Sequence, residues 1–310
     1  ITVFTSAHIG GYGADSENME SEKLHVNGIV TRNFSYHYSR TRAEESIEKL
    51  MEKYDVGGIS GVDTRALTNY IRENGSMAAV ISTEKDRVEE LKEELKKFQV
   101  NSNAVAEVSA KEAYLSGEDH ASHKVAVLDL GIKKSLLENL TERDCHVKVF
   151  PFDSSFEEME SFQPDGYFIS NGPGDPHFSE EVQAVVKKII DSGKPVFGVC
   201  LGHLMIALAS GLKVKKLKTG HNGLNHPVKN LITGKGEMTG QNISYVIDEE
   251  SLEDVEVIEV THIDLNDDTI AGIRLKNKPV FSVQFQAGSK PGPTDSLYLF
   301  DEFVESLKQN

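Results

Sequence analysis

The sequence predicts an α/β protein with two domains, and three observations support that prediction. At 310 residues, the chain exceeds the ~250–300 residues at which a single hydrophobic core usually stops growing. From residue 124 onward, apolar runs of strand length alternate with segments whose apolar residues recur at helical spacing. A small polar stretch, residues 115–123, stands before this alternation. We therefore expect a mixed α/β domain over residues 1–114, a linker, and a mostly parallel, flavodoxin-like sheet over residues 124–310.

The first domain is predicted to open with a short strand. Residues 1–5 are rich in β-branched residues, and a glycine-rich turn follows. Residues 43–54 and 86–98 carry charged amphipathic patterns, with Ile47, Leu50 and Met51 on one face. The spacing predicts two helices there.

In the second domain, four apolar runs predict buried strands. These are residues 125–130, 147–150, 166–170 and 195–199, and further strands are expected at 255–260, 270–275 and 280–285. Between them, Gly131 leads into a helix that reaches Leu140. Ser179 is placed to cap the next helix, which Gly193 ends, and a last helix is expected over residues 301–307. A sheet of this kind places its active residues on the loops that follow the strands.

Charge and composition argue against several classes of protein. The formal net charge is −16, which disfavours binding to phosphate backbones. No apolar run reaches the ~18 residues of a membrane span, and no signal peptide is recognised. Two cysteines, Cys145 and Cys200, make no disulfide framework. We therefore expect a cytoplasmic protein with no nucleic-acid or membrane partner, in which Cys145 belongs to the core.

The most informative segment is Gly198-Val-Cys200-Leu-Gly202, which joins a buried strand to the apolar helix expected at residues 204–209. It is the thiol counterpart of the Gly-x-Ser-x-Gly nucleophile elbow. A thiol at a helix start is exposed to the helix dipole, which favours the thiolate, and the N–H of Leu201 can bind an oxyanion. A buried structural cysteine in a glycine-flanked turn is the alternative.

A second signal follows the strand at residues 166–170. The segment Ser170-Asn-Gly172-Pro-Gly174-Asp-Pro176 is a rigid loop at the same edge of the sheet as Cys200. Its backbone N–H groups can be aimed at a substrate, and Gly174 is the candidate for a second oxyanion donor. A turn without chemistry is the alternative.

Taken together, four motifs resemble the class I glutamine amidotransferases. They are SNGPGDP at 170–176, GVCLGH at 198–203, GHNGLNHPVKN at 220–230 and SVQFQAGSKPGP at 282–293. With ITVFTSAHIGGYG at 1–13 and GISGVDTRALTNYIRENGSM at 58–77, the whole chain is most similar to the small subunit of glutamine-dependent carbamoyl-phosphate synthase. That family has a further strand-rich stretch before the position at which this chain begins, so the resemblance implies an incomplete first domain.

The resemblance implies a glutaminase that supplies ammonia for carbamoyl phosphate, an intermediate of pyrimidine and arginine biosynthesis. Its partner is a large synthetase subunit that uses ATP and Mg, while the small subunit needs no cofactor. Cys200 matches the nucleophile that forms a glutamyl thioester. Leu201 and Gly174 match the oxyanion donors, and Gly172 and Asn242 match positions that contact the glutamine.

The chain departs from the family where the base is expected. The family pattern is Gln-(Phe/Tyr)-His-Pro-Glu, and this chain reads Gln284-Phe-Gln286-Ala-Gly288. Gln286 thus replaces the histidine that acts as base, and Gly288 replaces the glutamate that orients it. An amide cannot exchange a proton near pH 7, and losing a triad member typically costs ~10⁴–10⁶-fold in rate.

Other departures fall at the expected glutamine site. Leu204 stands where the family has a glutamine, and Ser244 and Tyr245 replace a Gly-Phe pair. His177, just past the glycine loop, is the one new candidate for a base; His203, His221, His226 and His262 fall where the family also has histidine. No His, Cys, Asp or Glu grouping has a spacing typical of metal ligands, so no metal is expected.

Three hypotheses remain. The chain is a working glutaminase subunit with an unusual base; a catalytically impaired member, or pseudoenzyme, that keeps the fold and serves as a binding or regulatory component; or another cysteine hydrolase that uses the same elbow. The third predicts turnover of a different amide or ester that depends on Cys200.

Overall fold

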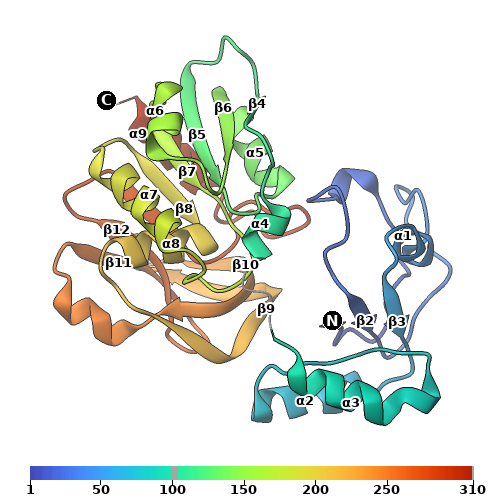
Figure 1. Ribbon diagram of the computed structural model, residues 1–310. Coiled ribbons are helices and arrows are strands. Elements are labelled where there is room, and N and C mark those ends of the chain that lie inside the picture. Colours follow the sequence, from blue (N-terminus) through green and yellow to red (C-terminus); the bar gives the residue numbers. More distant parts are fainter. Residues whose placement is uncertain (100–103, 309–310) are drawn as a thin grey trace. The chain divides into compact units, whose positions relative to one another are not determined.

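The computed structural model describes residues 1–99 and 104–308 (Figure 1). The chain divides into two compact units, residues 1–100 and 101–310, and each is described by itself. The smaller unit holds a three-stranded parallel sheet of β1 (Thr2–Val3), β2 (Gly28–Val30) and β3 (Gly57–Ile59). Its helices are α1 (Ile47–Lys53), α2 (Thr64–Asn74) and α3 (Val88–Lys97). The predicted first strand and both predicted helices are present, each shorter than expected.

The larger unit is built on a ten-stranded sheet with the order β10-β9-β11-β12-β13-β8-β7-β5-β6-β4. Its central part is parallel, formed by β13 (Val280–Val283), β8 (Val196–Val199), β7 (Gly166–Ile169), β5 (His123–Asp129) and β6 (Cys145–Pro151). The antiparallel strands are β4 (Tyr114–Ser116), β9 (Val214–Asn230), β10 (Gly236–Ile247), β11 (Ile258–Asp264) and β12 (Ile270–Leu275). The predicted mostly parallel, flavodoxin-like arrangement is confirmed for the centre of the sheet.

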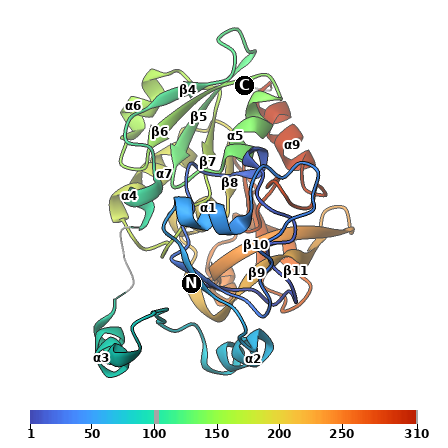
Figure 2. The same cartoon turned by 90° about the vertical axis from the view of Figure 1, so that its right-hand side faces the viewer.

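Helices cover both faces of the parallel strands (Figures 1 and 2). On one face, α6 (Phe156–Ser161), α7 (Glu180–Asp191) and α8 (Leu201–Ala209) pack in one hydrophobic cluster. On the other, α5 (Lys134–Thr141) and α9 (Tyr298–Leu307) pack in a second, which also contains Cys145. The strands are therefore buried on both sides, as their unbroken apolar runs predict. Cys145 is fully buried, as expected for a core residue.

The predicted linker over residues 115–123 differs from the structure at both ends. Tyr114–Ser116 forms β4, which pairs antiparallel with β6 and makes the edge of the large sheet. His123 already belongs to β5. The sequence does not reveal β4, because an edge strand of three residues has too short a pattern to detect and its side chains are largely exposed. The short helix α4 (Ala104–Val108) also belongs to the larger unit, whereas we expected its residues to belong to the first domain, residues 1–114.

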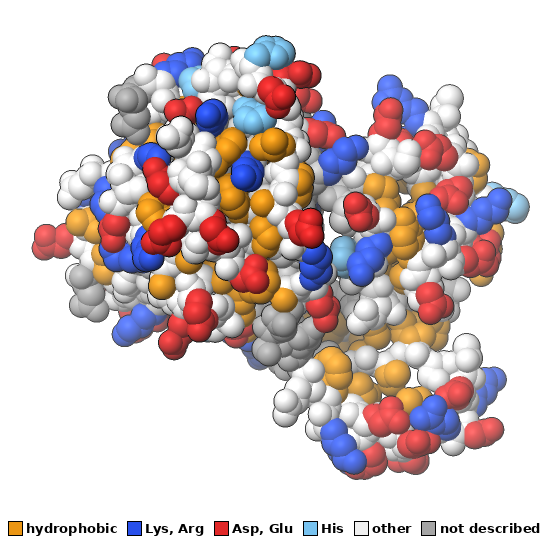
Figure 3. Space-filling model, turned by 45° about the horizontal axis from the view of Figure 1, so that its top comes forward, with side chains coloured by type: hydrophobic (Ala, Val, Ile, Leu, Met, Phe, Trp, Pro, Cys, Tyr) orange, Lys and Arg blue, Asp and Glu red, His pale blue; other side chains and the backbone are white. Residues whose placement is uncertain are grey.

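Two surface properties bear on the expected partners. Acidic and basic side chains are interspersed over the face shown in Figure 3, so the net negative charge is not gathered into one patch there. Among the residues that the structure describes, no helix is both long and apolar enough to cross a membrane.

Candidate active site

The loops that carry the predicted chemistry meet at one edge of the sheet. The parallel register pairs Leu128 with Ile169, Ile169 with Gly198, and Val199 with Val283. The segments that directly follow these strands therefore leave the sheet side by side. They contain Lys133 after β5, the glycine loop after β7, Cys200 after β8 and Gln286 after β13.

Cys200 occupies a strained turn. Its φ of 56° and ψ of −106° are rare for a residue other than glycine, and it forms the N-cap of α8. Two backbone hydrogen bonds hold the turn: the N–H of Cys200 donates to Val283 at 2.9 Å, and that of Gly202 donates to Ser170 at 3.0 Å. Neighbouring strands and loops thus impose the conformation of the predicted nucleophile elbow.

The thiol of Cys200 is surrounded by hydrogen-bond donors. The backbone N–H groups of Leu201 and Gly172 both interact with its sulfur, and Lys133 supplies a nearby positive charge. Burial nevertheless outweighs them and raises the pKa of the Cys200 thiol to about 11. The N–H at the helix start does favour the thiolate, as predicted, but the predicted net preference for the thiolate is wrong, because desolvation exceeds the effect of Lys133 and the two N–H groups. At pH 7 roughly one thiol in 10⁴ is ionised.

The two expected oxyanion donors are placed differently. Leu201 lies directly at the sulfur, together with Gly172, which was assigned to the glutamine. Gly174 is exposed and has a φ of 95°, and within residues 1–99 and 104–308 the N–H groups that act on the Cys200 thiol are those of Leu201 and Gly172. Its role as a donor stays a prediction. The geometry makes Leu201 and Gly172 the N–H pair nearest to the nucleophile.

Gln286, predicted to stand in place of the base, has a side-chain oxygen that already accepts hydrogen bonds. Its Oε1 accepts hydrogen bonds from the ammonium of Lys133 and from Ser289 Oγ, the latter at 3.0 Å. The backbone N–H of Gln286 donates to the carbonyl of Gly240 at 2.9 Å. Lys133 is therefore a common neighbour of Gln286 and Cys200. Sequence reasoning missed Lys133; the available signal was its position just after the first strand of the parallel sheet.

Gly288, predicted to stand in place of an orienting glutamate, has a backbone conformation that favours glycine. Its φ is 79°, and a Cβ built there would lie 2.8 Å from Nδ2 of Asn139 and 3.0 Å from Leu297. Asn139 is buried, and its amide donates to Ser135 at 2.8 Å. The backbone at this position is therefore incompatible with a glutamate in its present form.

The remaining predicted glutamine contacts are spread over two elements. Leu204 is buried in the cluster under α8 and offers no hydrogen bond from its side chain. On β10, Asn242 and Ser244 are exposed, while the Tyr245 hydroxyl donates to Asp175 Oδ2 at 2.7 Å. Tyr245 thereby links β10 to the glycine loop. Whether these residues contact glutamine stays a prediction.

The histidine within α8 and the histidine just past the glycine loop are both engaged elsewhere. His203 is fully buried, its Nδ1 lies 2.9 Å from Ser282 Oγ, and burial lowers its pKa to about 3. His177 is exposed, and its Nδ1 lies 3.0 Å from Asp175. Among the described residues, no imidazole contacts Cys200, so the structure offers no evident replacement for the missing base.

The raised pKa of Cys200 predicts a distinctive pH dependence of alkylation. We expect the rate of reaction with iodoacetamide to rise about tenfold per pH unit from pH 7 to 10, because only the thiolate reacts and it accumulates near pH 11. Mass spectrometry of the labelled peptide measures this rate, with Cys200→Ser as the control. A plateau at or below pH 8.5 would contradict it and reveal an activating group.

Comparison with protein-family models shows which families the chain is similar to. Residues 126–306 match the model described as glutamine amidotransferase class-I. Residues 1–81 match the model described as carbamoyl-phosphate synthase small chain, CPSase domain. The two matches fall in the larger and the smaller unit respectively.

Individual relatives agree with these matches. The carbamoyl phosphate synthase small chain of Staphylococcus epidermidis is 43% identical over 99% of this chain and 83% of its own length. That of Clostridium perfringens is 42% identical over 98% of this chain and 85% of its own. A solved structure from Thermoplasma acidophilum, described as one of the subunits of a GMP synthase, has a TM-score of 0.54 at 21% identity, covering 62% of this chain and 96% of its own. At that identity the last likeness supports the fold alone.

Proposed function

This chain belongs to the carbamoyl phosphate synthase small-chain family, within the class I glutamine amidotransferases, and on that premise we propose that it is a glutaminase-type subunit with severely impaired hydrolysis. The observation that supports this most directly is a retained nucleophile elbow without a base. Cys200 keeps its strained turn and two N–H donors, while Gln286 and Gly288 stand where base and orienting carboxylate belong.

The retained parts suit acyl transfer from an amide. The sulfur of Cys200 attacks the side-chain carbonyl carbon of glutamine, an S–C bond forms, and the carbonyl oxygen becomes an oxyanion. The N–H groups of Leu201 and Gly172, which donate to the sulfur, are the groups that we propose bind that charge. The C–N bond then breaks and ammonia leaves, after which water hydrolyses the thioester.

The missing parts limit the proton transfers of this reaction. The thiol must lose its proton and the departing nitrogen must gain one, and Gln286 can do neither. Lys133 stabilises negative charge near the sulfur but is bonded to Gln286 and Ser289. We place the loss of hydrolysis rate near the lower end of ~10⁴–10⁶-fold, because a cysteine thiolate attacks without a general base far better than a serine hydroxyl does.

The relatives are named as small chains, so the proposal includes a partner. We propose that the chain binds a large synthetase subunit that uses ATP and Mg, and that any ammonia it releases serves carbamoyl phosphate synthesis in the cytoplasm. If hydrolysis is abolished, binding to that subunit is the function that remains, and the chain is a regulatory or binding paralogue. The amide at position 286 favours this second candidate: its Oε1 already accepts from Lys133 and Ser289, and an amide cannot act as a base near pH 7.

Ammonia release tests the proposal. The purified chain, alone and with a synthetase large subunit, is incubated with glutamine beside Cys200→Ser. We expect slow release that disappears in the variant and increases toward alkaline pH, because the thiolate is scarce below pH 11. Release equal to that of the variant would exclude glutaminase activity. Co-purification of the chain and of its Cys200→Ser variant with the large subunit would then support the second candidate function. Absence of co-purification would contradict both candidate functions.

A further inference from the structure

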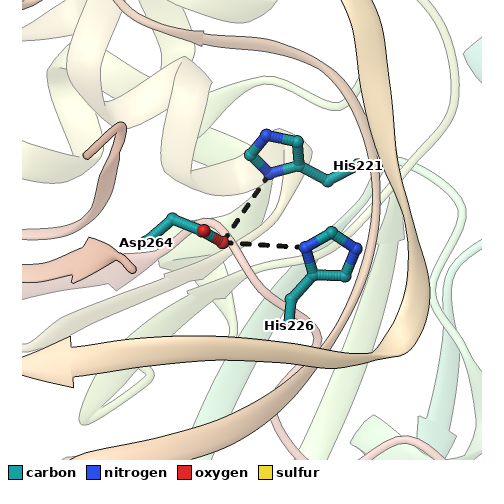
Figure 4. Close-up of side chains that lie close together, drawn as sticks. All are labelled: His221, His226 and Asp264. Carbon is teal, nitrogen blue, oxygen red and sulfur yellow. Dashed lines mark ion pairs between the residues drawn. The ribbon is translucent and has the colours of Figure 1, made fainter. Parts of the chain in front are cut away.

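Two histidines and an aspartate gather beside the predicted glutamine site without taking part in it. His221 and His226 come from β9, and Asp264 is the last residue of β11 (Figure 4). One ligand atom from each lies within 4.8 Å of the others. Asp264 Oδ2 is 3.8 Å from Nδ1 of His221 and 3.7 Å from Nδ1 of His226. Asp264 is only 1% exposed, so its charge needs compensation.

The ring of His226 points an unpaired nitrogen at this carboxylate. Its Nδ1 is buried and has no hydrogen-bond partner among the described residues. The ring's other nitrogen donates a hydrogen bond to the backbone of Asn222. A lone pair is thereby left facing the oxygen of Asp264, an arrangement that is repulsive unless a positive charge lies between them.

His221 is held in the orientation that a metal ligand requires. Its Nε2 lies 2.8 Å from Asp267 Oδ2, so a carboxylate fixes the ring from behind and leaves Nδ1 toward the cluster. Ligating histidines usually donate their second N–H to such a carboxylate. The two imidazole rings are stacked, with centroids 5.1 Å apart and planes 14° from parallel, so both Nδ1 atoms face the same side.

Gln241 completes the set of donors. Its Oε1 lies 2.8 Å from Nδ1 of His221, and its Nε2 donates to Asp264 Oδ2 at 2.9 Å. In this arrangement a proton lies between His221 and Gln241. An ion that replaced this proton would meet two imidazole nitrogens, a carboxylate oxygen and an amide oxygen.

From this geometry we propose a divalent transition-metal site, with Zn²⁺ as its preferred ion, formed by His221, His226, Asp264 and the carbonyl oxygen of Gln241. Two ligands at ~2.0–2.1 Å from one ion in tetrahedral geometry lie ~3.3 Å apart. The two distances from Asp264 to the imidazole nitrogens therefore need to contract by about 0.5 Å. Mixed imidazole and carboxylate donors suit Zn²⁺ and disfavour Mg²⁺ and Ca²⁺. The proposal is independent of the one for Cys200.

The site joins three strands next to the predicted glutamine-binding position. Gln241 directly precedes Asn242, and Gly240, one residue earlier, accepts the hydrogen bond from Gln286. Bound metal therefore stabilises the segment of β10 that lies against the active site. The four ligands are 5, 15 and 23 positions apart in the sequence, so no short motif contains them.

Titration of the full-length chain with ZnCl₂ after treatment with EDTA tests the proposal by calorimetry. We expect one ion per chain, and a rise in melting temperature of roughly 5–10 °C at a hundredfold excess over Kd. His226→Gln should weaken binding at least 100-fold, and Asp267→Asn by about 10–100-fold, since it only orients His221. His25→Asn, an exposed histidine of the smaller unit, is the matched control and should change nothing.

Cobalt substitution identifies the donors without relying on activity. A site of nitrogen and oxygen donors gives visible d–d bands without the strong ultraviolet sulfur-to-cobalt transition that binding at Cys200 would produce. Unchanged Zn²⁺ affinity in both His226→Gln and Asp267→Asn, or a sulfur-to-cobalt band, would overturn the assignment. Melting in EDTA shows whether the variants fold; Asp267 is partly exposed, so its variant is expected to match the wild-type chain there.

Discussion

Replacing Gln286 by histidine is expected to raise the rate of glutamine hydrolysis by about 10²–10⁴-fold, the usual contribution of a general base. Residue 286 follows β13, and the carbonyl of Val283 in β13 accepts a hydrogen bond from the N–H of Cys200. Residue 286 and Cys200 also share Lys133 as a neighbour. An imidazole there has an ordinary pKa near 6.5 and can take the thiol proton, whereas the amide cannot. Ammonia release and the pH profile of alkylation measure the change.

Two controls make this result specific. Gln286→Asn keeps an amide and should leave the rate unchanged, and Cys200→Ser combined with Gln286→His should abolish the gain. The alkylation profile of Gln286→His is expected to move to lower pH than that of the parent chain, because the imidazolium stabilises the thiolate. If both rate and profile stay as they are, residue 286 is out of reach of the sulfur and the proposed reason for the impairment is wrong.

Gly202→Ala is expected to destabilise the larger unit by roughly 3 kcal/mol or more. A Cβ at Gly202 would lie 2.2 Å from the carbonyl oxygen of Ile169 and 2.9 Å from that of Ser170. Both are backbone atoms of the central sheet and its loop, so neither can move aside cheaply. The hydrogen bond from Gly202 to Ser170 that holds the elbow would be stretched as well.

Urea denaturation followed by circular dichroism measures that loss. The matched control is Gly236→Ala at the start of β10, where a Cβ meets nothing within 4 Å and φ is not positive. We expect this control to change stability by less than about 0.5 kcal/mol. Equal denaturation midpoints for the two variants would show that the elbow is looser than its backbone contacts indicate.

The parts of the fold that sequence predicted are those whose pattern is local. Strands β5, β7 and β8 are uninterrupted apolar runs, and Ser179 caps α7 through Val182 as its position predicts. The hairpin of β9 and β10 was missed. Strand β9 is rich in lysine, histidine and asparagine, and few of its residues are buried. It pairs with β10 along most of its length, a long-range contact that no local pattern contains. Helix α6 was too short to show a period.

The same distinction applies to the site. The elbow at Cys200 is encoded within five residues, so its position and its N–H donor at Leu201 could be predicted. The contact between Lys133 and Gln286 joins residues 153 positions apart, and no local pattern contains it. The pKa of Cys200 also escaped prediction, since it depends on the packing that buries the sulfur and not on the turn alone.

If the triad has been lost as proposed, the conformation of Gly288 makes that loss harder to reverse at one position than at the other. A histidine can return at position 286 through one change of side chain, because the backbone there is ordinary. A glutamate at 288 first needs a new backbone conformation and room beside the buried Asn139. A Gly288→Glu substitution alone therefore lowers stability, and it brings no catalytic gain while residue 286 is not a histidine. A pair of Cys200 and a histidine at 286 needs one substitution. A complete triad needs in addition a glutamate at 288 and a change of backbone conformation that accommodates it.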